Sequence, residues 1–140
     1  MTPSNHKKGF TLIELLVVIS IIGLLSSVVL ASLRSARDRG NNAAVKSNMN
    51  NLRTQAAMYY DQYNNYAVVC SDPLIIRGRD AASMAGANNT TSDICNGSSG
   101  AWAASVPLKT AEGSNNYWCV DWAGTSKGHP SALGSATTCP

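Results

Sequence analysis

The sequence predicts an α+β protein in which one long amino-terminal helix packs on a small antiparallel β-sheet. Three observations support this class: an apolar segment near the amino terminus, a helical stripe of apolar residues after it, and strand-like patterns that occur only late in the chain. The chain has 140 residues, of which 44% are apolar and 14% charged. This composition has room for one small domain beside a membrane helix, and not for two cores.

The apolar segment covers residues 10–33, and 17 of its 24 residues are apolar. As a helix with a rise of about 1.5 Å per residue it would extend about 36 Å, enough to cross a hydrocarbon core of about 30 Å. Glu14 lies inside this segment, where a carboxylate costs roughly 2.5 kcal/mol or more at the bilayer centre. An acid in such a place is a candidate functional residue.

The residues just before and around Glu14 form a processing signal. Lys7 and Lys8 precede Gly9, and residues 9–14 read Gly-Phe-Thr-Leu-Ile-Glu and continue directly into the apolar segment. A secretory signal would instead be cut after its apolar region. The pattern closely resembles the amino terminus of type IV pilins and of the pseudopilins of type II secretion.

This resemblance implies a leader of residues 1–9, cleavage between Gly9 and Phe10 by a prepilin peptidase, and N-methylation of Phe10. It also implies that Glu14 pairs with the Phe10 amine, within one helix or, as the family favours, between neighbouring subunits. A lone acid or amine is costly in a low-dielectric helix bundle, and the pair offsets much of that cost. The alternative is a polar side chain that snorkels to the interface.

The resemblance further implies the type IV pilin fold, with a transmembrane half of the long helix at residues 10–33, an amphipathic half at 34–63 and an exported head at 64–140. The leader type and the cysteines place the amino terminus in the cytoplasm and the head outside the bacterial plasma membrane. The flanking charges do not decide this orientation, because Lys7 and Lys8 at one end are opposed by arginines at the other.

The amphipathic half is predicted from apolar residues at spacings of three and four, which fall on one side of a helix. They are Val45, Met49, Leu52, Ala56, Tyr59 and Tyr63. Gly40 with Asn41 and Asn42 weakens this helix and is a candidate bend or break. Gly23 is a second weak point. Pilins pair a glycine there with a proline several residues later, but no proline lies near Ala31, so local melting near Gly23 stays open.

The head is predicted to begin with an exposed loop at residues 64–101, in which residues 74–76 form a short strand or a single helical turn. Two strands follow, at 102–108 and 117–122, joined by a turn at 113–116. In the second strand, the period of two places Trp118, Val120 and Trp122 on one face. The last residues, 123–140, are expected to form a loop with a final short strand.

Four cysteines, Cys70, Cys95, Cys119 and Cys139, all follow the apolar segment. An even number in an exported domain of this size predicts two disulfides, and counting alone does not separate the three possible pairings. Locality favours Cys70 with Cys95, and the resemblance to the carboxy-terminal disulfide loop of pilins favours Cys119 with Cys139. The absence of a Cys-x-x-Cys motif argues against a zinc site.

Residues 124–128 read Gly-Thr-Ser-Lys-Gly and match the Gly-x-Ser-x-Gly nucleophile motif of hydrolases. The required histidine should lie far along the chain, but His129 is three residues from Ser126 and Pro130 prevents a following helix. His129 is therefore expected to be a solvated turn residue. No catalytic residue, metal ligand or cofactor is predicted, and we do not expect an enzyme.

Two further sets of polar residues are interpreted as exposed. Asp93 and Asp121 are expected to be turn acids, since the Asp-rich run of a calcium loop is missing. Asn88, Asn89 and Asn96 each begin an Asn-x-Ser/Thr sequon, which marks exposure and permits glycosylation.

The leading functional hypothesis is a structural subunit that forms a helical homo-oligomeric filament, either an extracellular pilus or a periplasmic pseudopilus. Its partners would be the prepilin peptidase and methyltransferase, the assembly machinery and, before assembly, the plasma membrane. The alternative is a minor pilin whose head binds DNA or a surface through Arg77, Arg79, Lys109 and Lys127. Without the leader, nine Lys and Arg face eight Asp and Glu, so charge argues only weakly for nucleic-acid binding.

Overall fold

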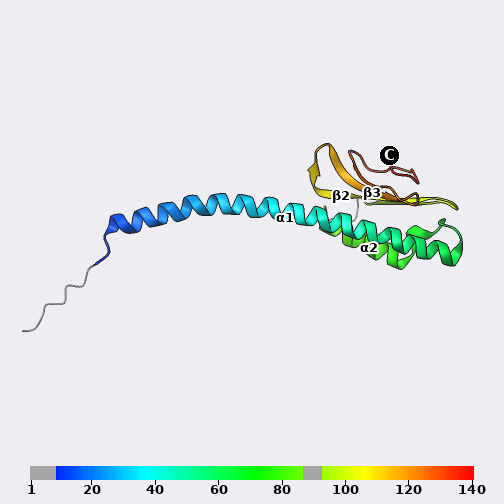
Figure 1. The fold of residues 1–140 in the computed structure, drawn as a ribbon, viewed down its shortest axis with the longest axis horizontal. Coiled ribbons are helices and arrows are strands. Elements are labelled where there is room, and N and C mark those ends of the chain that lie inside the picture. The colour runs from blue at the N-terminus through cyan, green and yellow to red at the C-terminus, as the bar shows by residue number, and fades with distance from the viewer. Residues whose placement is uncertain (1–8, 87–92) are drawn as a thin grey trace, which may run out of the picture. The chain divides into compact units, whose positions relative to one another are not determined.

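The computed structural model describes residues 9–86 and 93–140, and it confirms the α+β class with a long helix on a small antiparallel sheet (Figure 1). Its elements are α1 (Leu12–Tyr63), the 3-10 helix η1 (Val69–Ser71), α2 (Pro73–Ala85), β1 (Ile94–Gly97), β2 (Trp102–Glu112), β3 (Asn115–Asp121) and β4 (Ser126–His129). Most of the expected leader and the sequons at Asn88 and Asn89 lie outside the described residues.

Helix α1 is continuous over 52 residues and begins two residues after Phe10. Its apolar residues up to Leu33 are all exposed, and its most apolar window has a mean hydropathy of 2.6, enough in length and composition to cross a membrane. The chain divides into two compact units, residues 1–36 and 37–140, each of which is described by itself. The first unit therefore presents an uncovered apolar helix, and the second contains the core.

The long helix expected over both predicted halves is confirmed, and the candidate break at residues 40–42 does not occur, because α1 runs through them without interruption. Asn42 is buried and its side chain reaches the end of β2. Its Oδ1 accepts hydrogen bonds from the backbone N–H groups of Lys109 (2.7 Å) and Thr110 (3.3 Å), and its Nδ2 donates to the Thr110 carbonyl (2.9 Å) and to Glu112 Oε1 (3.1 Å). These long-range bonds offset the weak helix propensity of the Gly-Asn-Asn run.

Replacing Asn42 with alanine is expected to destabilise the second unit by about 1–3 kcal/mol, because two backbone donors of β2 lose their acceptor. Urea unfolding followed by circular dichroism would measure this loss. Asn51→Ala is the matched control, since Asn51 lies exposed on the same helix and should change stability by less than about 0.5 kcal/mol. Equal losses for the two variants would contradict the role given to Asn42.

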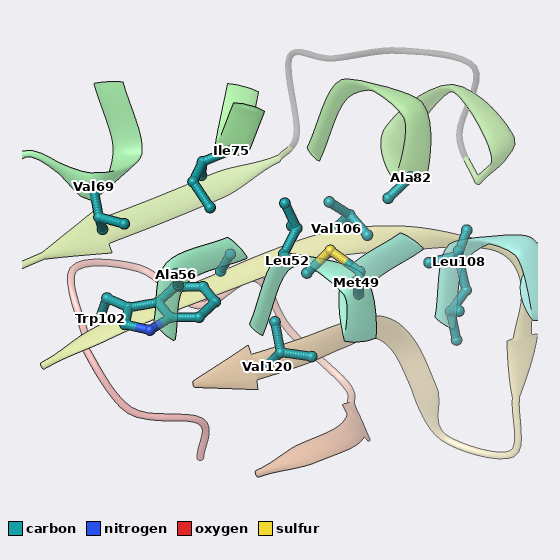
Figure 2. Packing of buried hydrophobic residues seen from close by; sticks show 12 residues of the cluster. Met49, Leu52, Ala56, Val69, Ile75, Ala82, Trp102, Val106, Leu108 and Val120 are labelled. Atoms are coloured by element: carbon teal, nitrogen blue, oxygen red, sulfur yellow. The ribbon is translucent and has the colours of Figure 1, made fainter. Parts of the chain in front are cut away.

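The four strands form one antiparallel sheet in the order β1-β2-β3-β4, and one of its faces packs against α1 (Figure 2). That face and the helix bury a shared core of Val45, Met49, Leu52, Ala56, Trp102, Ala104, Val106, Leu108 and Val120. The predicted helical stripe is thus confirmed up to Ala56, and Tyr59 is half-buried against the core. The prediction that Tyr63 belongs to the buried stripe is wrong, because its side chain is 51% exposed at the end of α1.

The loop expected at residues 64–101 is also wrong, since this range contains η1, α2 and β1. Asp72 caps α2 by accepting hydrogen bonds from the N–H groups of Leu74 (2.8 Å) and Ile75 (3.3 Å), and Pro73 occupies the first helical turn. The pair Asp72-Pro73 is a helix-start signal that the loop prediction overlooked. Ile75 and Ala82 then bury the inner side of α2 in the core.

Strands β2 and β3 are longer than expected at the turn between them, where Gly113 has a φ of 65° that favours glycine. Trp118 and Val120 face α1 as predicted, and the expected final short strand is β4. The prediction for Trp122 is wrong: β3 ends at Asp121, and the Trp122 side chain is 49% exposed.

Residues 130–140, here called the strap, lie on the opposite side of the sheet from α1. Leu133 is buried there with Ala103 and Cys119 in a second, small cluster. The structure joins Cys119 to Cys139 and Cys70 to Cys95, the two pairs favoured from the sequence. The first of these disulfides fastens the end of the strap to β3.

Asn96 also holds the strap, because its Nδ2 donates to the carbonyls of Gly134 and Ala136, each at 2.8 Å. The interpretation of the Asn96 sequon as exposed holds only in part, because Asn96 is half-buried and engaged with the strap. A glycan on this nitrogen would remove hydrogen bonds between β1 and the strap.

Candidate assembly site

The first turn of α1 is closed by a reciprocal pair of hydrogen-bonding residues, Thr11 and Glu14. Thr11 Oγ1 accepts from the N–H of Glu14 (3.3 Å), while Glu14 Oε2 accepts from the N–H of Thr11 (2.8 Å) and from its hydroxyl (2.7 Å). This is a capping box, which satisfies backbone donors that have no partner inside the helix. The Thr-x-x-Glu spacing in the sequence indicates such a cap, and our sequence interpretation missed it.

The capping box uses only one oxygen of the Glu14 carboxylate. Within residues 9–86 and 93–140, Oε1 of Glu14 accepts no hydrogen bond, and the side chain is exposed. Phe10 is also exposed, at 81%, and stands one helical turn before Glu14. The local geometry therefore leaves a carboxylate oxygen available for a donor from another molecule.

An apolar surface surrounds this carboxylate and continues along the first unit to Leu33. The two serine hydroxyls with recorded partners bond within the helix: Ser20 donates to the Leu16 carbonyl and Ser27 to the Leu24 carbonyl, both at 2.8 Å. Such local bonding lets hydroxyl groups enter an apolar environment at low cost. An uncovered apolar surface of this extent has to be covered by lipid or by other protein.

The Gly-x-Ser-x-Gly match does not form a nucleophile site. Ser126 lies in β4, where its hydroxyl donates to Asn50 Oδ1 (2.7 Å) and accepts from Trp118 Nε1 (3.2 Å). The expectation that His129 is a solvated turn residue is wrong, because it is 3% exposed and its Nε2 lies 3.0 Å from Ser105 Oγ. Ser126 and His129 thus have different partners and do not act as a nucleophile with its base.

The two acids interpreted as exposed turn residues are both buried. Asp121 is 3% exposed; its Oδ1 accepts from the N–H groups of Ala123 (3.1 Å) and Thr125 (2.9 Å), and its Oδ2 accepts from the N–H of Cys139 (2.9 Å). Asp93 Oδ2 lies 2.5 Å from Arg79 Nε. The part of the chain that the structure describes contains no group of three His, Cys, Asp or Glu side chains that could hold a metal ion.

The four basic residues proposed as nucleic-acid contacts differ in their surroundings. Arg79 is tied to a buried carboxylate, as just described, whereas Arg77, Lys109 and Lys127 are exposed and come from α2, β2 and β4. The ion pair removes one of the four from free contact with a phosphate.

Residues 4–30 match the family model described as the prokaryotic N-terminal methylation motif. Over 62 residues the chain is 44% identical to the type IV wide pilus major component PilA4 of Thermus thermophilus. This match covers 44% of the chain and 47% of the relative. It is 30% identical, also over 62 residues, to the type IV major pilin protein PilA of Myxococcus xanthus. This match covers 28% of the length of that relative. In its amino-terminal region, the chain is similar to type IV pilins.

The matched motif contains Gly9, Phe10 and Glu14, and it overlaps the exposed apolar part of α1. The chain spans less than half the length of the relatives it matches. Neither relative is named as an enzyme. No solved structure matches the chain significantly.

Proposed function

We propose that this chain is a type IV pilin, a structural subunit of a type IV pilus that is made as a prepilin and polymerised into a helical filament. The observation that carries the proposal is the uncovered apolar half of α1, which begins with a partly unsatisfied acid inside the methylation motif. An apolar helix of this kind is stable in lipid or in a bundle of like helices, and assembly exchanges one environment for the other.

Processing would create the positively charged partner that the Glu14 carboxylate lacks. Cleavage between Gly9 and Phe10 turns the peptide nitrogen of Phe10 into an amine, which the peptidase partner then methylates. Glu14 Oε2 stays in the capping box, while Oε1 accepts a hydrogen bond from the amine of a neighbouring subunit. The pair neutralises two charges that would each be costly alone in the filament core, and it sets the axial position of each subunit.

Before assembly the subunit would cross the plasma membrane once, with its amino terminus in the cytoplasm and residues 37–140 outside. The assembly machinery then extracts it. The alternative, a minor pilin that binds DNA or a surface, is not favoured, because both relatives are named as major pilus proteins and Arg79 is engaged by Asp93. A pseudopilus of type II secretion has less direct support than a pilus, because both relatives are named as pilus proteins.

Mass spectrometry of the intact protein in purified surface filaments tests this function. We expect a chain that begins at Phe10 and carries the mass of one added methyl group. A Gly9→Leu variant is the control: it should keep its leader, remain in the membrane fraction and contribute nothing to filaments. Filaments that lack this chain, or that contain it with residues 1–9 attached, would contradict the proposal.

A further inference from the structure

His129 lies at the end of β4, directly before the strap, and its imidazole is enclosed on the face of the sheet that the strap covers. One ring nitrogen, Nε2, lies 3.0 Å from Ser105 Oγ on β2, and the ring centroid is 5.7 Å from that of Tyr117 on β3. The other nitrogen, Nδ1, is buried and has no hydrogen-bond partner among the described residues. The site therefore gives one nitrogen of the ring a hydrogen-bond partner and leaves the other without one among the described residues.

This environment accepts a neutral imidazole but not a charged one. A neutral histidine carries one N–H, whereas the protonated ring carries two and needs an acceptor for each. In the protonated ring, whichever nitrogen gains the proton, Nδ1 is a buried donor without an acceptor among the described residues, and a buried charge without a partner is costly. Protonation is therefore expected to favour any state in which the ring reaches water.

The ionisable groups around this face do not offset that cost. Lys127, two residues away on β4, has the same sign of charge as a protonated imidazole. Asp121 on β3 already accepts three backbone hydrogen bonds, and Tyr117 on β3 meets the imidazole through its aromatic ring. Ser105 from β2 carries no charge, and the strap contains no Asp, Glu, Lys, Arg or His.

We propose that His129 is an acid-sensitive latch for the strap. Protonation of the imidazole frees the end of β4 and the first residues of the strap from the sheet, while the Cys119–Cys139 disulfide keeps the far end attached. The opened state exposes the small apolar cluster of Ala103, Cys119 and Leu133. The head would thus present a different surface in an acidic medium.

The direction of the effect follows from the titration of the ring. Burial lowers the pKa of His129 from its ordinary 6.5, and Lys127 lowers it further. Because the closed state has the lower pKa, its stability is complete above 6.5 and is lost as the pH falls through the window below that value. One proton changes the opening equilibrium by at most about tenfold per pH unit.

Amide hydrogen exchange of the full chain in detergent, corrected for the intrinsic pH dependence of exchange, tests the latch. Between about pH 7 and about pH 5 we expect the protection of the β4 amides, Ser126–His129, to fall by no more than about tenfold per pH unit, while that of α2 stays constant. A His129→Gln variant should lose this pH dependence. A His6→Gln variant, which removes the other histidine of the chain, should keep it.

Proton NMR titration of the wild-type ring is a second measurement that does not depend on the folding of any variant. The His129 Cε1 proton should titrate with a midpoint below 6.5. A midpoint at or above that value, pH-independent protection of β4, or unchanged pH dependence in His129→Gln would overturn the proposal. None of these results depends on whether the chain forms filaments, so the latch and the pilus function are tested separately.

Discussion

A Glu14→Gln variant is expected to insert into the membrane normally and to form almost no filaments. Glutamine keeps an oxygen that accepts from the Thr11 N–H, so the capping box at the start of α1 survives the change. The negative charge is lost, and with it the partner that we propose for the Phe10 amine. A loss of about 1.4 kcal/mol per contact lowers the affinity of one subunit for the next about tenfold.

The measurement compares the sheared surface fraction with the membrane fraction by immunoblot and counts filaments by electron microscopy. Thr11→Val is the matched control, because it removes the hydroxyl of the capping box and keeps the Glu14 charge. That variant should still polymerise. If Glu14→Gln assembled normally and Thr11→Val did not, Glu14 would act through the cap and not through its charge.

Replacing Trp102 with alanine is expected to destabilise the head by about 3–5 kcal/mol, as for other large aromatic residues removed from cores. Trp102 is the largest fully buried side chain, 1% exposed at the start of β2, and its ring lies 6.4 Å from that of Tyr66. Figure 2 shows it beside Ala56 of α1. Because small domains are stable by only about 5–15 kcal/mol, this variant should be close to unfolding.

Trp122→Ala provides a control of the same residue type, since its side chain is 49% exposed just after β3. We expect it to cost about 1 kcal/mol or less in urea unfolding followed by circular dichroism. Similar losses for the two tryptophans would show that the exposed ring carries as much packing energy as the buried one, contrary to the structure.

Much of the fold could be predicted because it depends on regular spacing along the chain. The stripe from Val45 to Ala56 follows the helical period, and Trp118 and Val120 follow the strand period. The residues from Gly9 to Glu14 are contiguous, so the motif that they form is visible without any folding. Two signals were present and misread: Thr11 with Glu14 is a capping box, and Asp72-Pro73 starts a helix.

The errors at buried polar residues share one physical cause, which is that their hydrogen-bond partners lie far away in the sequence. Asn42 meets Lys109 and Thr110 across the domain, and Asp121 meets the N–H of Cys139. His129 is enclosed with Ser105, 24 residues away. A polar side chain becomes a favourable part of an interior only when folding supplies its hydrogen-bond partner.

The sequence by itself therefore determined the membrane-length apolar helix, its processing motif, the buried helical stripe and two disulfides in the head. Each depends on residue type and short spacing, which do not change when the chain folds. Only the tertiary structure decided that the Asn42 side chain bonds to the end of β2, that Asn96 and Asp121 hold the strap, and that His129 is buried. These features depend on contacts between residues distant in the sequence, which form only when the sheet, helix and strap come together.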